Sequence, residues 1–391
     1  MKNKRKKMML TVCTALFMAT VPLVACGTIK QNNAIEEAAE APVPIGRMEL
    51  QYATQYSVEY YSGGYVHVHV EDGNDYVCVP QGALDNRLGI ENVTIIHLPC
   101  EQVYLAASSA MDYFQCLDGL FAITACSTKA EDYSSPLIQE RIRDGGITYV
   151  GKYSAPDYEG LLAMNCGLAI ESTMIYHSPK IKEELESLQI PVLVERSSYE
   201  EDPLGRLEWI KLYGVLLQKE EAANAFFDEQ CRKVEALRQE LCDKQAGTEP
   251  KKVAFFYIAS NGYVNVRKPG DYLCKMIETA GGTYAFSDLY LEEENALSTV
   301  NINWEDFYKK AVDADILIYN GTIDGSVTSL EDLLNKNALF ADYKAVQNKK
   351  VWVTDANLYQ EGSKVADIIE DLYYVIGEDG ESDTEFLHRL D

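Results

Sequence analysis

The sequence predicts an α/β protein with two Rossmann-like lobes bridged by a long rigid helix, preceded by a β-hairpin or meander. Its 391 residues are too many for one ordinary core and suit two domains. The longest uninterrupted helical pattern lies mid-chain, and short apolar segments alternate with helical patterns on both sides of it. Because strands that alternate with helices build a parallel sheet covered by helices, each side is predicted to form one lobe.

The bridging helix is predicted at residues 202–246. Asp202 is a good N-cap, and Pro203 suits the first helical position, where a missing N–H costs nothing. Apolar residues then recur at helical spacing, with a weak point at residues 214–218, until Gly247 and the proline that follows end the pattern. We therefore expect one rigid helix between the lobes.

The N-terminal lobe is assigned to residues 46–201. Strict alternation in V-H-V-H-V and nearby Gly-rich turns predict a β-hairpin or meander over residues 48–80. The α/β part follows, with a first helix near residues 103–117. Its strands are expected at residues 93–98, 120–124, 148–150, 168–170 and 192–194.

The C-terminal lobe is assigned to residues 250–378, with the same alternation of strands and helices. Residues 379–391 form an acidic tail that we expect to be mobile. The strands of this lobe are expected at residues 253–258, 316–319 and 350–354, and its helices at 272–280, 304–312, 330–334 and 363–376.

The N-terminus has the pattern of an export signal, predicted at residues 1–25. Five Lys or Arg residues precede an apolar stretch that is short for a membrane span. It ends in L-V-A-C-G, which resembles the lipobox of bacterial lipoproteins, in which the Cys, here Cys26, is acylated. Residues 26–45 are rich in Glu, Ala and Pro and are predicted to be a lipidated flexible tether. We expect an extracytoplasmic protein that is lipid-anchored to the bacterial cell membrane; an ordinary signal peptide cleaved near Ala25 is the alternative.

The composition argues against nucleic acid as a partner. Removing residues 1–25, with their five positive charges, changes the formal charge from −26 to −31. An acidic surface keeps an exported protein soluble, and attraction of a cationic ligand is a second interpretation. The eight Cys residues after Cys26 have no C-x-x-C or zinc-ligand spacing, and their pairing is left open.

The sequence contains no catalytic motif that we can assign. It lacks G-x-S-x-G, a P-loop, G-x-G-x-x-G after a strand, and H-E-x-x-H. His67 and His69 would share one face of a strand, but no third ligand lies close in sequence, so a solvated polar face is the better interpretation. We predict no enzyme activity, no protein-held metal and no cofactor.

Two lobes of this kind bind ligands where the loops at the carboxyl ends of their strands face each other across a cleft. Those loops carry aromatic, Arg and Asn side chains, which suit a large, partly apolar ligand with anionic or carbonyl oxygens, such as a porphyrin, a corrin or a ferric siderophore. The residues predicted to bind it are Tyr104, Met174, Arg196, Tyr199, Tyr263, Arg267, Asn320 and Tyr359.

Three stretches of the sequence form a recognisable set: I-P-V-L-V-E-R with the following P-L-G-R-L-E-W, I-E-T-A-G-G at residues 277–282, and D-A-D-I-L-I at residues 313–318. Together they resemble a known family, the substrate-binding lipoproteins of bacterial ABC importers for iron–siderophore, haem or cobalamin. The resemblance implies a monomer that delivers an iron or corrin chelate to an ABC permease dimer and its ATPase. Among the ligands we favour a ferric siderophore, with haem and cobalamin as alternatives. A surface receptor or sensor lipoprotein without a transport role is a rival from a different class.

The resemblance also implies one surface Glu on each lobe that pairs with Arg residues of the permease. Glu159, in P-D-Y-E, and Glu305, in N-W-E, occupy the two positions. One exposed anion on each lobe lets a dimeric permease grip both lobes. The alternative is that both Glu residues are favoured only by the dipole at a helix start. Cys166-Gly167 departs from the Pro-Asp of the family pattern at the N-terminal lobe.

Overall fold

The computed structural model describes residues 41–244, 249–289, 298–377 and 384–391. The predicted signal peptide, the lipidation site Cys26, most of the tether and the first residues of the acidic tail lie outside this part of the chain. None of the helices that it contains is both long and apolar enough to span a membrane.

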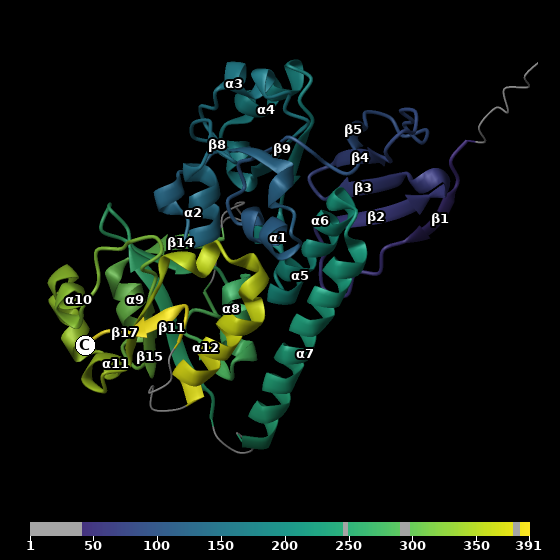
Figure 1. Cartoon of the computed structure of the whole chain (residues 1–391). Helices are drawn as coiled ribbons and strands as arrows, with labels where there is room; N and C mark the ends of the chain where they lie inside the picture. Colours follow the sequence, from purple (N-terminus) through teal and green to yellow (C-terminus); the bar gives the residue numbers. More distant parts are fainter. Residues whose placement is uncertain (1–40, 245–248, 290–297, 378–383) are drawn as a thin grey trace, which may run out of the picture. The chain divides into compact units, whose positions relative to one another are not determined.

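The N-terminal strands form a five-stranded sheet in the order β1-β2-β3-β4-β5 (Figure 1). The predicted meander is confirmed, since the first three pairs are antiparallel. β5, however, runs parallel to β4 and belongs to this sheet, so the prediction that it opens the α/β sheet is wrong. The predicted tether also ends earlier than residue 45, because β1 begins at Pro44. The strands are β1 (Pro44–Arg47), β2 (Tyr56–Tyr61), β3 (Val66–Val70), β4 (Asn74–Val79) and β5 (Thr94–His97).

The α/β part of the N-terminal lobe is a parallel sheet in the order β10-β9-β6-β7-β8. Its central strand is β6 (Val103–Leu105), where the sequence predicted the start of a helix. A short, fully buried apolar run has no periodicity that separates strand from helix, which explains the error. The other elements are β7 (Ile123–Cys126), β8 (Thr148–Tyr149), β9 (Leu168–Ser172), β10 (Val192–Glu195), α1 (Ala110–Cys116), α2 (Pro136–Arg143), α3 (Tyr158–Ala163) and α4 (Pro179–Ser187).

The connection between the lobes consists of α5 (Pro203–Glu208), α6 (Ile210–Leu217) and α7 (Glu220–Lys244), the long helix of Figure 1. The predicted cap is present, since Asp202 accepts a hydrogen bond from the Leu204 N–H. The prediction of a single continuous helix is wrong, because Gln218 adopts a left-handed conformation with φ of 55°, which ends α6. Gly214 then lets α6 lie close to α7, because a Cβ there would be 2.7 Å from that of Ala223.

The C-terminal lobe is a seven-stranded sheet in the order β14-β12-β11-β15-β16-β17, with β13 beside the first part of β11. Its elements are β11 (Lys251–Ile258), β12 (Val264–Arg267), β13 (Gly282–Tyr284), β14 (Thr299–Ile302), β15 (Ile316–Tyr319), β16 (Val351–Thr354), β17 (Leu387–Arg389), α8 (Tyr272–Thr279), α9 (Trp304–Ala311), α10 (Leu330–Lys336), α11 (Lys344–Gln347) and α12 (Val365–Gly377). The helices α8, α9, α10 and α12 and the strands β11, β15 and β16 were predicted within a few residues, whereas α11 was not predicted.

The end of the acidic tail is ordered, which corrects the expectation that it is mobile. β17 pairs antiparallel with β16 and forms the edge of the sheet. Phe386, Leu387 and Leu390 are buried, and Asp371 accepts hydrogen bonds from the backbone N–H groups of residues 385 and 386. Three apolar side chains therefore fix a segment whose overall composition is polar.

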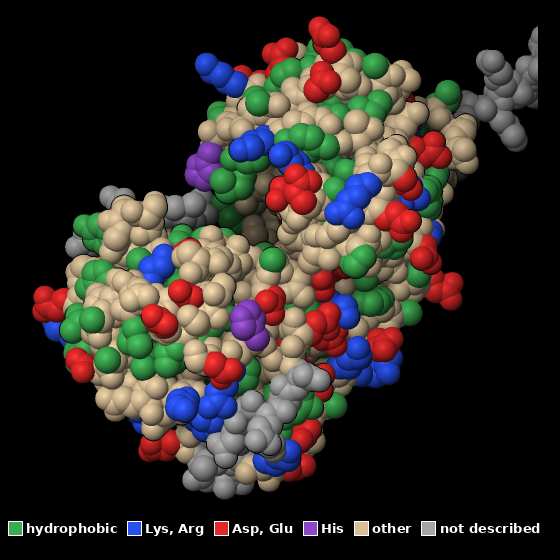
Figure 2. Space-filling model, turned by 60° about the vertical axis from the view of Figure 1, so that its left-hand side comes forward, with side chains coloured by type: hydrophobic (Ala, Val, Ile, Leu, Met, Phe, Trp, Pro, Cys, Tyr) green, Lys and Arg blue, Asp and Glu red, His purple; other side chains and the backbone are tan. Residues whose placement is uncertain are grey.

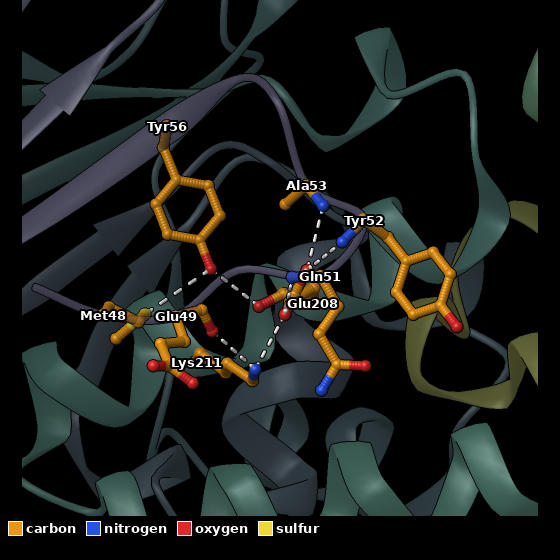
Figure 3. Close-up of polar contacts among 8 residues, drawn as sticks. All are labelled: Met48, Glu49, Gln51, Tyr52, Ala53, Tyr56, Glu208 and Lys211. Carbon is orange, nitrogen blue, oxygen red and sulfur yellow. Dashed lines mark hydrogen bonds and ion pairs between the residues drawn. The ribbon is translucent and has the colours of Figure 1, made fainter.

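Two buried carboxylates on and before α5 hold the segment that leads into β2, and sequence analysis missed them. Glu208 is fully buried and accepts hydrogen bonds of 2.8–3.0 Å from the backbone N–H groups of residues 51–53, while Lys211 donates to it at 2.7 Å (Figure 3). Glu200 holds residues 54 and 55 in the same way. A buried carboxylate is tolerated because it is paired and hydrogen-bonded. Gly205 allows this approach, since a Cβ there would lie 2.9 Å from the Tyr52 carbonyl oxygen.

Candidate functional site

The candidate site is a pocket of about 570 Å³ lined by residues of both α/β lobes. The N-terminal lobe contributes α1 and the loops after β6 and β7, and the C-terminal lobe contributes the segment after β16. These are carboxyl ends of parallel strands, where open α/β sheets bind ligands. Figure 2 shows a face of the molecule that is hollowed near its centre.

Hydrogen bonds join the two lobes beside this pocket. Ser134, after β7, donates its backbone N–H to the Gln360 side chain at 2.8 Å and its hydroxyl to Glu361 at 2.9 Å. Asp112, on α1, accepts the backbone N–H of Ser363 at 2.8 Å. The residues that make these contacts are not among those predicted from the sequence to bind a ligand.

Exposed hydrophobic side chains mark other loops at the same strand ends. Met174 (47% exposed) and Tyr176 follow β9, Tyr263 (49%) follows β11, and Ile323 follows β15. A second pocket of about 590 Å³ lies at the ends of β11 and β15, with Ile323 and Tyr257 in its wall. Met174 and Tyr263 are therefore placed in exposed loops as predicted. Exposed apolar groups of this kind suit contact with an apolar ligand surface.

Arg196 and Tyr199 also lie in the predicted loop, after β10, but the guanidinium is occupied by the protein. It stacks over the Tyr199 ring at 4.6 Å, donates to the Gln55 side-chain oxygen at 2.9 Å and donates to the Tyr176 hydroxyl at 3.0 Å. Burial raises the pKa of Tyr176 to about 12, and its hydroxyl donates to Asp72. Arg196 thus ties the loops of the lobe to the N-terminal sheet.

The structure contradicts the predicted placement of Arg267 in a loop. Arg267 ends β12, is buried, and forms a two-point ion pair with Asp271 at 2.8 and 2.9 Å. Burial opposes the charge, but Asp271 holds the pKa of the guanidinium well above its ordinary value. A bidentate carboxylate already uses the donors that would bind an anion.

Asn320 and Tyr359 lie together behind the loops of the C-terminal lobe. Asn320, 2% exposed, donates its side-chain N–H to the Tyr359 hydroxyl at 2.9 Å. The Tyr359 ring lies 5.7 Å from the Arg267 guanidinium, and burial raises the pKa of its hydroxyl. Three of the predicted binding residues therefore lie together: Tyr359 contacts both Asn320 and Arg267, and the latter two are buried.

Tyr104 is in the wrong place for a ligand contact. It lies in β6, fully buried, rather than in the loop after a strand. It packs in a cluster of buried side chains with Leu161 of α3 and Leu185 of α4. Glu171, on the neighbouring strand β9, is also fully buried, and neither carboxylate oxygen has a hydrogen-bond partner among the described residues. Burial raises the Glu171 pKa to about 8, so this acid keeps its proton at neutral pH.

Glu159 and Glu305 occupy equivalent places in the two lobes. Glu159 lies in the first turn of α3, which leads to β9, and Glu305 lies in the first turn of α9, which leads to β15. Both are exposed, and Glu305 forms a 2.7 Å ion pair with Lys309. Both helix starts are capped by side chains, those of Asp157 and Asn303. The two carboxylates are thus placed similarly on the two sheets.

The histidines of the N-terminal sheet form a polar cluster. His67 and His69 contact the same oxygen of Asp75 at 2.8 and 2.9 Å. Burial opposes the charge of Asp75, but these hydrogen bonds hold its pKa below the usual range. Within the described ranges, no group of three or more His, Cys, Asp or Glu side chains has an arrangement that could hold a metal ion, and the eight Cys residues there are free thiols.

A family model described as periplasmic binding protein matches residues 116–358, which is more than half of the chain. The chain belongs to the periplasmic binding protein family. This confirms the resemblance, the two-lobed α/β fold and the prediction of a substrate-binding protein rather than an enzyme.

Relatives and solved structures agree with this assignment. An uncharacterized lipoprotein of Methanocaldococcus jannaschii is 25% identical over 305 residues, which are 76% of this chain and 70% of the relative. A periplasmic haem-binding protein from Pseudomonas aeruginosa aligns with a TM-score of 0.59 at 16% identity, over 74% of this chain and 98% of that one. A possible iron-binding periplasmic solute-binding protein from Staphylococcus epidermidis aligns with a TM-score of 0.55 at 16% identity, over 71% and 100% of the two chains. These structures share the fold of this periplasmic binding protein.

Proposed function

We propose that this protein captures an iron complex, a ferric siderophore, in the cleft between its lobes and delivers it to an ABC permease. The observation that carries the proposal is the pocket lined by both lobes at the carboxyl ends of their strands. The exposed Met174 and Tyr263, in loops at other strand ends, offer apolar surface of the kind that a large ligand could contact, although neither lines this pocket. The names of two structural neighbours, one haem-binding and one described as possibly iron-binding, support a metal complex as the ligand.

The proposal includes an extracytoplasmic location with a lipid anchor at Cys26. The sequence pattern at residues 23–27 and the lipoprotein names of two M. jannaschii relatives support it. The protein itself holds no cofactor in this proposal, acts as a monomer, and touches the membrane only through its lipid.

Glu159 and Glu305 dock to Arg residues of the permease dimer, whose ATPase drives import. Their support is their exposure and their matched positions at helix starts of the two lobes. Charges at the rim of an interface mainly set orientation and association rate. The Lys309 partner of Glu305 is exposed, so this ion pair is weak enough to be exchanged for a permease Arg.

Two alternatives remain in the proposal. The first keeps the transport role but takes haem or cobalamin as the ligand, and the haem-binding neighbour favours it. The second is a surface receptor or sensor that binds a ligand in the same cleft without a permease. Charge reversal at Glu159 and Glu305 separates transport from sensing, because it leaves the ligand pocket unchanged.

The test is fluorescence titration of the purified protein with several ferric siderophores, haem, cobalamin and free divalent metals. Trp304 is the natural reporter, since it is partly exposed and its indole N–H donates to the Gly262 carbonyl, next to Tyr263. The proposal expects saturable quenching by one ferric siderophore, reduced in amplitude in Trp304→Phe. Saturable quenching by haem or cobalamin alone would select the first alternative, and no quenching of the folded protein would refute chelate binding.

A further inference from the structure

The pocket between the lobes has an unbalanced negative charge. Four carboxylates line it, those of Asp112, Asp355, Glu361 and Glu385, together with one lysine, Lys364. Three of the four come from the C-terminal lobe and one from α1, so the charge is contributed by both sides of the pocket.

One lysine cannot neutralise four carboxylates. The charge of Lys364 favours the ionised forms of Asp112 and Glu361, but its ammonium forms an ion pair with Asp367 of α12, outside the pocket lining, at 3.3 Å. The Asp355 carboxylate contacts the His388 imidazole of β17 at 3.1 Å, which would form an ion pair with it when the imidazole is protonated. Two of the other carboxylates receive hydrogen bonds from neutral donors, the backbone N–H of Ser363 on Asp112 and the Ser134 hydroxyl on Glu361.

The pKa directions agree with this geometry. Burial raises the pKa of Asp112. Burial also raises the pKa of Glu361, and the nearby charges of Asp112 and Glu385 raise it further. Carboxylates that repel one another in a partly desolvated pocket gain most from a cation, which a ligand can bring.

A neutral polar group at the pocket wall also lacks a partner. Tyr133 lines the pocket and is 3% exposed, and its hydroxyl has no hydrogen-bond partner among the described residues. The Thr128 side chain lies near it, outside hydrogen-bond geometry. A buried hydroxyl without a partner costs free energy, and a small shift of the wall that exposed this oxygen would let a ligand group pair with it.

The arginines that would favour an anionic ligand are engaged elsewhere. Arg267 is paired with Asp271, and Arg196 is hydrogen-bonded to Gln55 and Tyr176. The charge pattern of the described cleft is therefore opposite to the one needed for carboxylate or catecholate oxygens.

We propose that the ligand presents a protonated amine to this acidic pocket, so that the protein selects cationic chelates over neutral and anionic ones. The inference rests on the proposed function, because it assumes that a chelate occupies the cleft. In this proposal the amine lies among Asp355, Glu361 and Glu385.

The experiment compares two linear ferric tris-hydroxamate complexes that differ only in one group, a free terminal amine or the same amine acetylated. Affinities of the purified protein are measured by isothermal titration calorimetry at neutral pH and at two salt concentrations. We expect the amine form to bind at least tenfold more tightly, with the difference shrinking at high salt. In Glu361→Gln, which keeps an acceptor for Ser134, the preference should fall to threefold or less. Glu331→Gln, an exposed residue of α10, is the matched control and should keep the full preference.

Asp355→Asn is the second variant, and its preference for the amine form should fall in the same way. Because Asp355 is partly exposed, this variant is expected to fold even if Glu361→Gln does not. Equal affinity for the two complexes would overturn the inference, as would a preference that survives in both variants. Tight binding of an anionic ferric siderophore without binding of either hydroxamate would also overturn it, and would leave the proposed function intact. Binding of haem alone would overturn it and select the first alternative to the proposed function. Failure of the folded protein to bind any chelate would overturn the proposed function and the inference together.

Discussion

Glu171 gives the folded protein a pH-dependent stability that one substitution should remove. Its carboxyl is fully buried without a hydrogen-bond partner among the described residues, and burial raises its pKa from 4.5 to about 8. The unfolded chain releases this proton near pH 4.5, whereas the folded chain holds it up to about pH 8. The raised pKa therefore costs stability as pH rises between these values, and nothing below them.

The size of the effect follows from the two pKa values. At about 1.4 kcal/mol for each pH unit, the penalty from Glu171 reaches about 3 kcal/mol at pH 7, and it levels off at about 4 kcal/mol near pH 8, where the folded-state carboxyl is half ionised. Glu171→Gln has no proton to release, so this slope disappears. Burying the glutamine amide also costs free energy, but that cost does not change with pH.

The assay is urea unfolding of the protein and of Glu171→Gln at several pH values from 5 to 8. We expect the stability of the variant relative to the wild type to rise steadily with pH, by several kcal/mol over the range. Glu183→Gln, on the exposed side of the covering helix α4, is the matched control and should follow the wild type. Parallel curves for wild type and Glu171→Gln would refute the reasoning, because they would mean that Glu171 is ionised or solvated in the fold.

Three further predictions concern the N-terminal segment and the docking carboxylates. Glu208→Ala should destabilise the protein by about 3–5 kcal/mol in urea unfolding, because it leaves a buried lysine without its carboxylate partner and frees three backbone N–H groups. An unchanged midpoint would contradict the role of Glu208 in holding residues 51–53. Gly205→Ala should cost about 1–3 kcal/mol by the same measurement, because the new Cβ meets a carbonyl oxygen at 2.9 Å; Gly146→Ala, in an exposed turn, should cost less. Reversing both charges, Glu159→Lys with Glu305→Lys, should abolish ligand uptake by cells and leave ligand affinity in vitro within twofold; retained uptake would rule out the docking role.

Much of the fold could be predicted because periodicity and turn residues act locally. The limits of β15 and the start of α8 agree with the predictions, and the Asp202 cap forms as expected. β6 was taken for a helix because three buried apolar residues have no distinguishing period. β17 was missed because its stability comes from pairing with β16, a contact that no local pattern reports.

The site was predicted less well, because a sequence shows which residues belong to a loop but not which side chains elsewhere in the chain they contact in the fold. Met174 and Tyr263 lie in exposed loops because their strands were located correctly. Arg267 was misjudged because strand β12 carries it inward and Asp271, four residues on, binds it. The acidic pocket escaped notice because its carboxylates come from residues 112 to 385, brought together only by the fold.

The central claim is that an iron chelate binds between the two α/β lobes. The most direct measurement is a crystal structure of the protein soaked or co-crystallised with a ferric hydroxamate, with iron located from anomalous differences at its absorption edge. The account predicts one iron peak between the lobes, with ligand atoms in contact with both sides of the pocket and only a small relative movement of the lobes, as the packed α5–α7 connection resists wide closure. An iron peak on the outer surface, such as beside His67 and His69, with an empty cleft would contradict it.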